Sequence, residues 1–356
     1  MVASSNRAGA AERGAASGGR LRLARRVAAP IAAASAALLA VAPAARAQDE
    51  PPSEAQDEPR ASRAAADPDG PPSLLGLSHG GVQLHFDYTF ASAEPTDVSS
   101  SETLSDAHAY AYAARWLVEA PITSPRWFLG AVHDVAGASV PAGTTPGTGG
   151  STLIPGNPEI WGRGLWTSEL GLSAGGGLGL VVPLPRSYSA LEQEVVRAVR
   201  VVRPWDVPHF EDRALTLRPF FDLRHVTGPV TLQMRQGFDA LFRVRELGPF
   251  ENRYDLAGLV RVYVGLRAAT WLTLGLEIEE LYELTADVSS PRCPAPCDEG
   301  RSALAFEPSV RVHLPGMSGA VSMLVPLATP LRSEVASYLA ARVHVDIPLP
   351  WGEEQK

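Results

Sequence analysis

Residues 273–284, TLGLEIEELYEL, alternate apolar and ionised side chains with a period of two. Leu274, Leu276 and Ile278 share one parity, and Glu277 and Glu279 fall on the other. Because successive side chains of a β-strand point to opposite faces, this spacing predicts a strand with one apolar and one charged face. Which solvent each face meets then decides the fold.

The same alternation recurs along the chain and predicts an all-β protein. The regular segments are residues 81–90, 106–120, 214–225, 255–271, 303–314 and 341–349. Less regular candidates are residues 126–135, 157–167, 168–184, 229–236, 238–246 and 318–328. Together these segments predict about twelve strands, joined by short turns and by longer polar loops.

Two segments break the period of two. In residues 189–203, SALEQEVVRAVRVVR, the apolar side chains fall on one helical stripe, and Ser189 with Glu192 forms a capping box. This pattern predicts one short helix of about fifteen residues within a loop. Residues 143–158, GTTPGTGGSTLIPGNP, contain so many glycines and prolines that we expect a loop there.

The N-terminal region is predicted to be an export signal. Four arginines precede an Ala-rich apolar run, and Ala45 and Ala47 supply the small residues that a signal peptidase requires. Residues 1–47 are therefore expected to be removed, although an uncleaved anchor is the alternative. Residues 48–78 are acidic and proline-rich, with too few large apolar side chains to form a core, and are predicted to be a disordered linker.

Charge and cysteine content exclude several classes of protein. Residues 1–47 hold seven of the 31 Lys and Arg residues and one of the 39 acids, which leaves a strongly acidic mature chain. Such a chain lacks the basic surface of a nucleic-acid-binding protein. Cys293 and Cys297 are the only cysteines, and in an oxidising compartment they are predicted to form a disulfide within one loop. We expect neither a metal site nor a cofactor.

Three features favour a membrane barrel over a soluble sheet. The alternate residues that form the polar face of each predicted strand, called here the polar parity, include charged residues in the middle of strands. This suits a barrel with a polar lumen and apolar residues that face lipid. Tryptophans lie near predicted strand ends, where interfacial girdles form. They are Trp116, Trp127, Trp205, Trp271 and Trp351. The strands are also long enough to cross a bilayer when tilted. We therefore predict an antiparallel transmembrane β-barrel of about 12 strands over residues 79–351, followed by a tail at 352–356, with an exported soluble β-sandwich binding protein as the alternative.

Charged residues of the polar parity are the candidate lumen and selectivity residues. They are Asp87, Arg261, Arg267, Glu277, Glu279, Glu307 and Arg311. Glu277 and Glu279 are about 7 Å apart on one strand face, so they either favour cations, as acidic rings do in pores, or form ion pairs with neighbouring arginines.

Other side chains offer weaker candidates for chemistry. Arg197, Arg200 and Arg203 recur every three residues on the predicted helix and are candidates for anion binding or for a solvated helix face. If the helix folds into the barrel mouth, these arginines would oppose acidic lumen groups and the helix would act as a partial plug. A histidine of the polar parity paired with a serine would allow a membrane hydrolase. The histidines are His85, His313 and His344. No nucleophile elbow is present, so we expect no enzyme.

The segment GNPEIWGRG, residues 156–164, together with the alternating strands and the export signal, resembles Gram-negative outer-membrane β-barrels. It is similar in particular to transporter-like barrels associated with phenol-degradation pathways, in which a Gly-Asn/Asp-Pro turn opens a strand. The resemblance implies an outer-membrane location and contact with lipid, lipopolysaccharide and the barrel-insertion machinery.

The predicted function is a passive channel or facilitated transporter for a small solute that the sequence does not identify. A non-conducting structural or surface-interaction barrel is the alternative.

Overall fold

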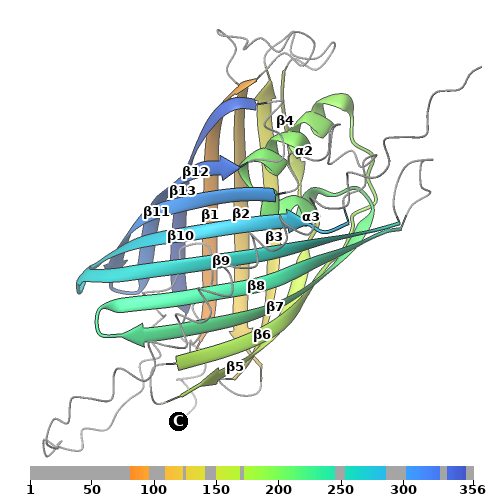
Figure 1. The fold of residues 1–356 in the computed structure, drawn as a ribbon. Coiled ribbons are helices and arrows are strands. Elements are labelled where there is room, and N and C mark those ends of the chain that lie inside the picture. The colour runs from red at the N-terminus through yellow and green to blue at the C-terminus, as the bar shows by residue number, and fades with distance from the viewer. Residues whose placement is uncertain are drawn as a thin grey trace, which may run out of the picture. The chain divides into compact units, whose positions relative to one another are not determined.

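In the computed structural model, the chain forms one antiparallel sheet that closes on itself (Figure 1). The structure describes residues 81–95, 109–122, 126–140, 150–168, 172–244, 253–285, 302–328 and 335–349. The strands are β1 (Val82–Pro95), β2 (Ala109–Pro121), β3 (Trp127–Val140), β4 (Gly150–Pro155), β5 (Glu159–Thr167), β6 (Leu172–Val181), β7 (Ala214–Thr227), β8 (Val230–Arg243), β9 (Tyr254–Ala269), β10 (Leu272–Glu283), β11 (Ser302–Leu314), β12 (Met317–Ala328) and β13 (Val335–Leu349). The helical segments among these residues are α2 (Ala190–Val202), the 3-10 turn η2 (Pro204–Asp206) and α3 (Val207–Phe210).

The pairing of the first strand with the last closes the wall. β1 pairs with β2 on one side and with β13 on the other, from Val82 opposite Leu349 to Pro95 opposite Val335. β4 and β5 share one position, because β4 pairs with the second half of β3 and β5 with its first half. The wall therefore has twelve strand positions around the barrel. The predicted twelve-stranded barrel is confirmed, and the β-sandwich alternative is wrong.

Two local expectations were wrong. Residues 150–155, expected to lie in a loop, form β4, because they extend the wall along β3 despite their glycine and proline content. The two candidate strands at 229–236 and 238–246 are one strand, β8, which runs through Gly237. The predicted signal peptide, the linker, the C-terminal tail and the Cys293–Cys297 disulfide lie outside the described residues.

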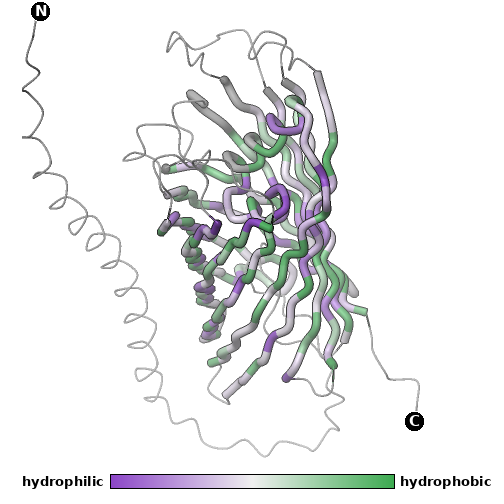
Figure 2. Tube along the Cα trace, turned by 90° about the vertical axis from the view of Figure 1, so that its right-hand side faces the viewer, coloured by the Kyte–Doolittle hydropathy of each residue, from purple (hydrophilic) through white to green (hydrophobic). Residues whose placement is uncertain are grey.

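The two faces of the wall have the predicted character, and Figure 2 shows hydrophobic and hydrophilic residues alternating along the strands. In β10, Leu274, Leu276 and Ile278 point outward and are 42–45% exposed, whereas Glu277 and Glu279 point inward and are fully buried. An outward apolar face suits lipid, because lipid offers no partner to polar groups. Among the described helices, none is long and apolar enough to cross a membrane.

The outward tryptophans fit the predicted interfacial girdle in part. Trp116, Trp127 and Trp271 are 48–58% exposed on the outer surface. Trp205 does not belong to the girdle, since it is 2% exposed and lies inside the barrel. Trp351 is outside the described residues.

The two ends of the barrel differ in their connections. At one end, called here the short-turn end, β7–β8, β9–β10 and β11–β12 are joined by two residues each. Gly228 and Gly316 adopt φ of 54° and 79° in two of these turns, a conformation that tight hairpins need and that glycine adopts without strain. The opposite, loop end carries the longer connections. Outer-membrane barrels place short turns in the periplasm and long loops outside.

The outward face of β10 yields a test of the lipid assignment. Ile278→Arg places a charge near the middle of the wall and should lower the free energy of unfolding by about 2–4 kcal/mol, because a charge at the bilayer midplane is poorly solvated. The matched control, Leu314→Arg, lies at a strand end and should cost about 0–1 kcal/mol. Urea unfolding in lipid vesicles measures both, and equal costs at the two positions would contradict a lipid-facing belt.

Candidate functional site

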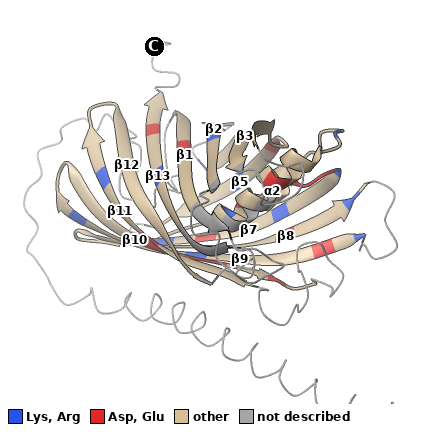
Figure 3. Ribbon diagram, turned by 90° about the horizontal axis from the view of Figure 1, so that it is seen from above, with Lys and Arg blue, Asp and Glu red and all other residues tan. Residues whose placement is uncertain are grey.

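The segment between β6 and β7 folds into the lumen instead of forming an outer loop. We call residues 182–213, which include α2, η2 and α3, the plug. In the view from the loop end, α2 lies within the ring of strands (Figure 3). Ser189 and Glu192 cap α2 through both bonds of the predicted capping box. The predicted helix is thus confirmed, and it lies inside the barrel, as the partial-plug hypothesis expected.

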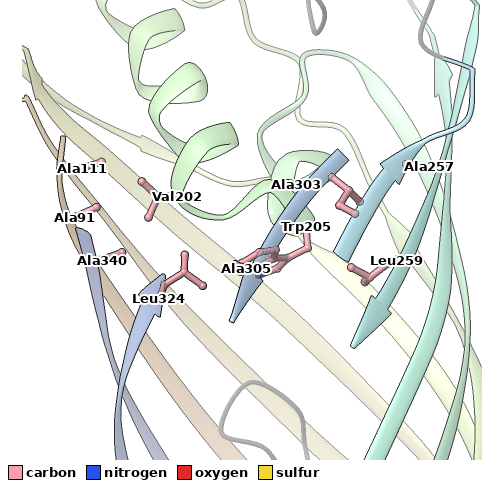
Figure 4. Packing of buried hydrophobic residues seen from close by; sticks show 11 residues of the cluster. Ala91, Ala111, Val202, Trp205, Ala257, Leu259, Ala303, Ala305, Leu324 and Ala340 are labelled. Atoms are coloured by element: carbon pink, nitrogen blue, oxygen red, sulfur yellow. The ribbon is translucent and has the colours of Figure 1, made fainter. Parts of the chain in front are cut away.

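Small apolar residues of the wall make room for the plug. Val195, Val199 and Phe210 pack against inward residues of β2, β3 and β4, namely Ala113, Ala136, Ala138 and Ile154. Val202 and Trp205 pack against a second group, from β1, β2 and β9 to β13 (Figure 4). That group comprises Ala91, Ala111, Ala257, Leu259, Leu281, Ala303, Ala305, Leu324 and Ala340. Because alanine occupies most of these inward positions, the lumen near the loop end is wide enough for a helix.

One buried asparagine joins both stems of the plug to the wall. Asn157, in the Gly-Asn-Pro turn between β4 and β5, is fully buried. Its Nδ2 donates to the carbonyl of Glu211 at 2.8 Å, and its Oδ1 accepts from the amide of Leu184 at 3.0 Å. Its own amide donates to the carbonyl of His209. The tripeptide singled out in the sequence therefore interrupts one strand and holds the start and the end of the plug.

Below the apolar contacts, the plug meets the wall through charges. Arg203 contacts Asp87 of β1 at 3.1 Å and also pairs with Asp206. Asp206 accepts from Arg115 of β2 at 2.5 Å. All these side chains are buried or nearly so. The pairs join the plug to two adjacent strands, and each charge lost would leave its partner without full compensation.

His209 extends the same layer toward β3 and β5. Its Nδ1 lies 2.9 Å from Asp134, and its Nε2 lies 2.8 Å from Glu159. Arg115 also binds Asp134 through two bonds of 2.7–2.8 Å. Arg218 of β7 binds Glu159 at 2.9 Å. The histidine therefore lies between two carboxylates that arginines of the wall also bind.

Burial and charge shift the pKa values of these plug groups in opposite ways. Burial alone would raise the pKa of Asp206, but Arg115 and Arg203 lower it to about 2. Burial alone would lower the pKa of His209, but the charge of Asp134 and hydrogen bonds to Asp134 and Glu159 raise it above its ordinary value. Asp206 is therefore ionised, and the raised pKa favours the imidazolium form of His209.

Trp205 lies where the plug reaches deepest among the charges. Its ring is stacked under the guanidinium groups of Arg342 and Arg261, 4.7 Å and 5.4 Å from the ring centre. Arg218 donates to its carbonyl at 3.1 Å. Both stacked arginines also face the acids of the lumen. Arg342 lies 2.5 Å from Glu307 and 3.7 Å from Glu279, and Arg261 lies 3.5 Å from Glu279.

The seven predicted lumen residues all point inward, but they fall into separate groups. Glu277, Glu279 and Glu307 lie together, with carboxylate oxygens within 4.8 Å of one another, and Arg261 is beside them. Asp87 pairs with the plug. Arg267 and Arg311 lie near the short-turn end. Their role in selectivity stays a prediction. Of the three helix arginines, Arg203 reaches the lumen, and the side chains of Arg197 and Arg200 lie outside the described part of the structure.

Two further arrangements bear on chemistry. Two sets of side chains are spaced closely enough to hold a metal: Asp134, Asp206 and His209, and His85, Asp87 and His344. In both sets, however, arginines already pair with the acids. Ser322 lies 3.3 Å from His344 Nε2, and His344 Nδ1 lies 3.3 Å from Asp87. These are the members of a hydrolytic triad. However, the serine hydroxyl donates to Glu307 and not to the histidine.

A cavity of about 100 Å³ lies between the plug and the wall of β2, β3, β5, β7, β8 and β9. Its lining includes Arg115, Asp206, Trp161, Phe220 and Arg235. Gly237 also lines it. Aromatic surface and paired charges therefore border the same space.

From the sequence, only the helix at 189–203 was expected as a partial plug, and the rest of the plug was not expected. Its signal was present in two features, the alanines at inward positions near the loop end and the residues PWDVPHF at 204–210, which carry Trp205, Asp206 and His209. The alternating pattern shows that an alanine points inward only where polar residues on the same face of its strand mark that face as the inner one.

The comparisons with known proteins support the fold. No family model matches the chain, and no curated protein matches it. Among solved structures, an outer membrane channel from Pseudomonas putida F1 aligns with a TM-score of 0.55 and 9% identity, covering 80% of this chain and 98% of that chain. The NanC porin aligns with a TM-score of 0.45 and 10% identity, covering 75% of this chain and all of that chain. The first likeness shows that the chain has the fold of an outer-membrane β-barrel.

The protonation of His209 predicts how the plug responds to pH. Because the pKa of His209 is raised on folding, its stabilising contribution is complete below about pH 6.5 and is lost as pH rises through the raised value. Hydrogen exchange of plug amides, corrected for intrinsic rates, should therefore show more opening at about pH 9 than at about pH 6. His209→Gln should show little of this difference. An equal response in both proteins would assign the effect to another group.

Proposed function

We propose that the protein is a gated passive channel for a small solute, which the plug closes. The observation that carries the proposal is that the plug fills the loop-end half of the lumen without joining the sheet. It is held by side-chain pairs and by its two stems at Asn157. It can therefore leave without breaking the hydrogen bonds of the wall.

Two considerations support a passive channel over a facilitated transporter. The wall is one continuous ring of antiparallel pairs, whereas alternating access requires two bodies that move against each other. The solved structure from Pseudomonas putida F1 is named as a channel, and its fold is similar. The apolar outer face suits outer-membrane lipid, and contact with lipopolysaccharide and with the insertion machinery remains part of the proposal.

Neutralising Asp206 should open the channel more often. Asp206→Asn removes the charge that pairs with Arg115 and Arg203, although those arginines keep Asp134 and Asp87. Losing hydrogen bonds between charged groups costs about 1.5–3 kcal/mol, which corresponds to about a ten- to hundredfold increase in the ratio of open to closed channels. Single-channel recording in planar bilayers measures this ratio.

The matched control is Asp212→Asn, which removes the same charge from the same segment. Asp212 lies at the end of the plug, 3.8 Å from the exposed Arg213. It should leave the open probability unchanged. If neither the wild type nor Asp206→Asn conducts after correct insertion, the non-conducting barrel is favoured.

The passive mechanism predicts how solute flux depends on concentration. In liposomes that contain Asp206→Asn, the initial rate of solute entry should rise linearly with the external concentration, because an open pore has no binding step that must turn over. Stopped-flow swelling with a series of small uncharged solutes measures the rate. Saturation at millimolar concentration would indicate facilitated transport instead.

A further inference from the structure

Three inward arginines gather at the short-turn end of the lumen, away from the plug. Arg224 lies on β7, Arg267 on β9 and Arg311 on β11, each two or three residues before its strand ends. Arg224 and Arg311 are 6% and 4% exposed. The charge of Arg224 interacts with the charges of Arg267 and Arg311. Because the three guanidinium groups repel one another, a bound anion would stabilise the arrangement.

Buried hydrogen-bonding groups without partners point to the same place. Within the described residues, Nε and Nη2 of Arg311 have no hydrogen-bond partner, although its Nη1 lies 3.1 Å from Asp346. Gln233 of β8 pairs in register with Arg224 and is fully buried, and neither of its amide atoms has a hydrogen-bond partner in the part of the chain that the structure describes. Burying a polar group without a partner is unfavourable, so these atoms are candidates to bind a ligand.

Two glycines leave space for hydroxyl groups at this end of the lumen. A Cβ at Gly265 would lie 2.8 Å from the hydroxyl oxygen of Tyr263, and a Cβ at Gly275 would lie 2.7 Å from it. The glycines therefore allow the Tyr263 side chain to lie along β9 and β10 toward the short-turn end. The Ser309 hydroxyl approaches the same position of Gly275. The Tyr263 oxygen also interacts electrostatically with Arg224.

We propose that these groups form an oxyanion-binding site at the short-turn mouth of the barrel. The site consists of Arg224, Arg267, Arg311, Gln233, Tyr263 and Ser309. Guanidinium groups bind carboxylates and phosphates through charge-assisted, often bidentate hydrogen bonds, and amide and hydroxyl donors complete the shell. The ligand is a carboxylate or phosphate group.

Acids of the lumen border this site. Glu277 is opposite Tyr263 in register, and Glu279 and Glu307 lie with it. Arg261 lies 3.5 Å from Glu279, and Arg342 lies 2.5 Å from Glu307, so arginines already pair with these two acids. That the transported solute itself carries the oxyanion rests on the proposed function, whereas the binding site does not.

Isothermal titration calorimetry on the full-length protein, folded in detergent, tests the site directly. The probes are inorganic phosphate and acetate at constant ionic strength. The wild type should bind at least one of them saturably. Arg311→Gln should weaken binding by about tenfold or more, because it removes both unpartnered nitrogens. Gln233→Leu should weaken binding severalfold while leaving thermal stability unchanged or higher, because it removes a buried amide without partners.

The control is Arg126→Gln, an exposed arginine in the turn between β2 and β3 at the same end of the barrel. It should bind like the wild type. Saturable binding of phosphate alone or of acetate alone would identify the source of the oxyanion. Absence of saturable binding, or equal binding by Arg311→Gln, Gln233→Leu and the wild type, would overturn the site. Because the measurement needs no conductance, a silent channel that binds anions would reject the channel and keep the site.

Discussion

Charged groups that point into a narrow barrel must find their counter-charges there. A closed wall with lipid outside leaves its inward residues with little bulk water, and a buried charge is tolerated only when it is paired and hydrogen-bonded. The pairs of this lumen include Arg163–Glu119, Arg235–Asp222 and Arg342–Glu307, all with an N–O distance of 2.5–2.6 Å. Each pair joins two strands that are adjacent or separated by one strand, so the pairing also fixes how neighbouring strands lie against one another.

The plug depends on this constraint. The charges in its deepest part, Arg203, Asp206 and His209, meet acids and an arginine of the wall, so the wall and the plug complete one network. Nearer the loop end, helix α2 of the same segment packs against alanines and other apolar residues of the wall. Apolar contact is insensitive to salt and pH, whereas ion pairs respond to pH through their protonation. The deep half of the plug is therefore the half that solution conditions can release.

Much of the wall could be predicted from the sequence, because alternation is local. In a strand such as β10, twelve residues are enough to distinguish the apolar face from the charged face. The charged face predicts that the barrel has a polar lumen. The capping box of α2 is equally local. The place of α2 inside the barrel was one hypothesis among several, because a helix with one apolar stripe packs equally well against a lumen, a neighbouring loop or a partner. Its docking depends on alanines from strands that are far apart in the sequence, such as Ala91 and Ala340.

The sequence predicted which residue types point into the lumen, but not which of these residues lie close together. Arg261, Arg267 and Arg311 all read as lumen arginines, yet Arg261 stacks on Trp205 and faces Glu279, while Arg311 lies near Arg224 at the mouth. The stagger of the strands decides which inward residues share a level, and no single strand encodes that stagger. Along the barrel axis the lumen thus changes from apolar contacts to ion pairs, and then to the arginines of the mouth, where Arg311 pairs with Asp346. In the proposed channel, a solute that enters from the short-turn end meets these arginines first, and movement of the plug gives it a way past the ion-paired layer.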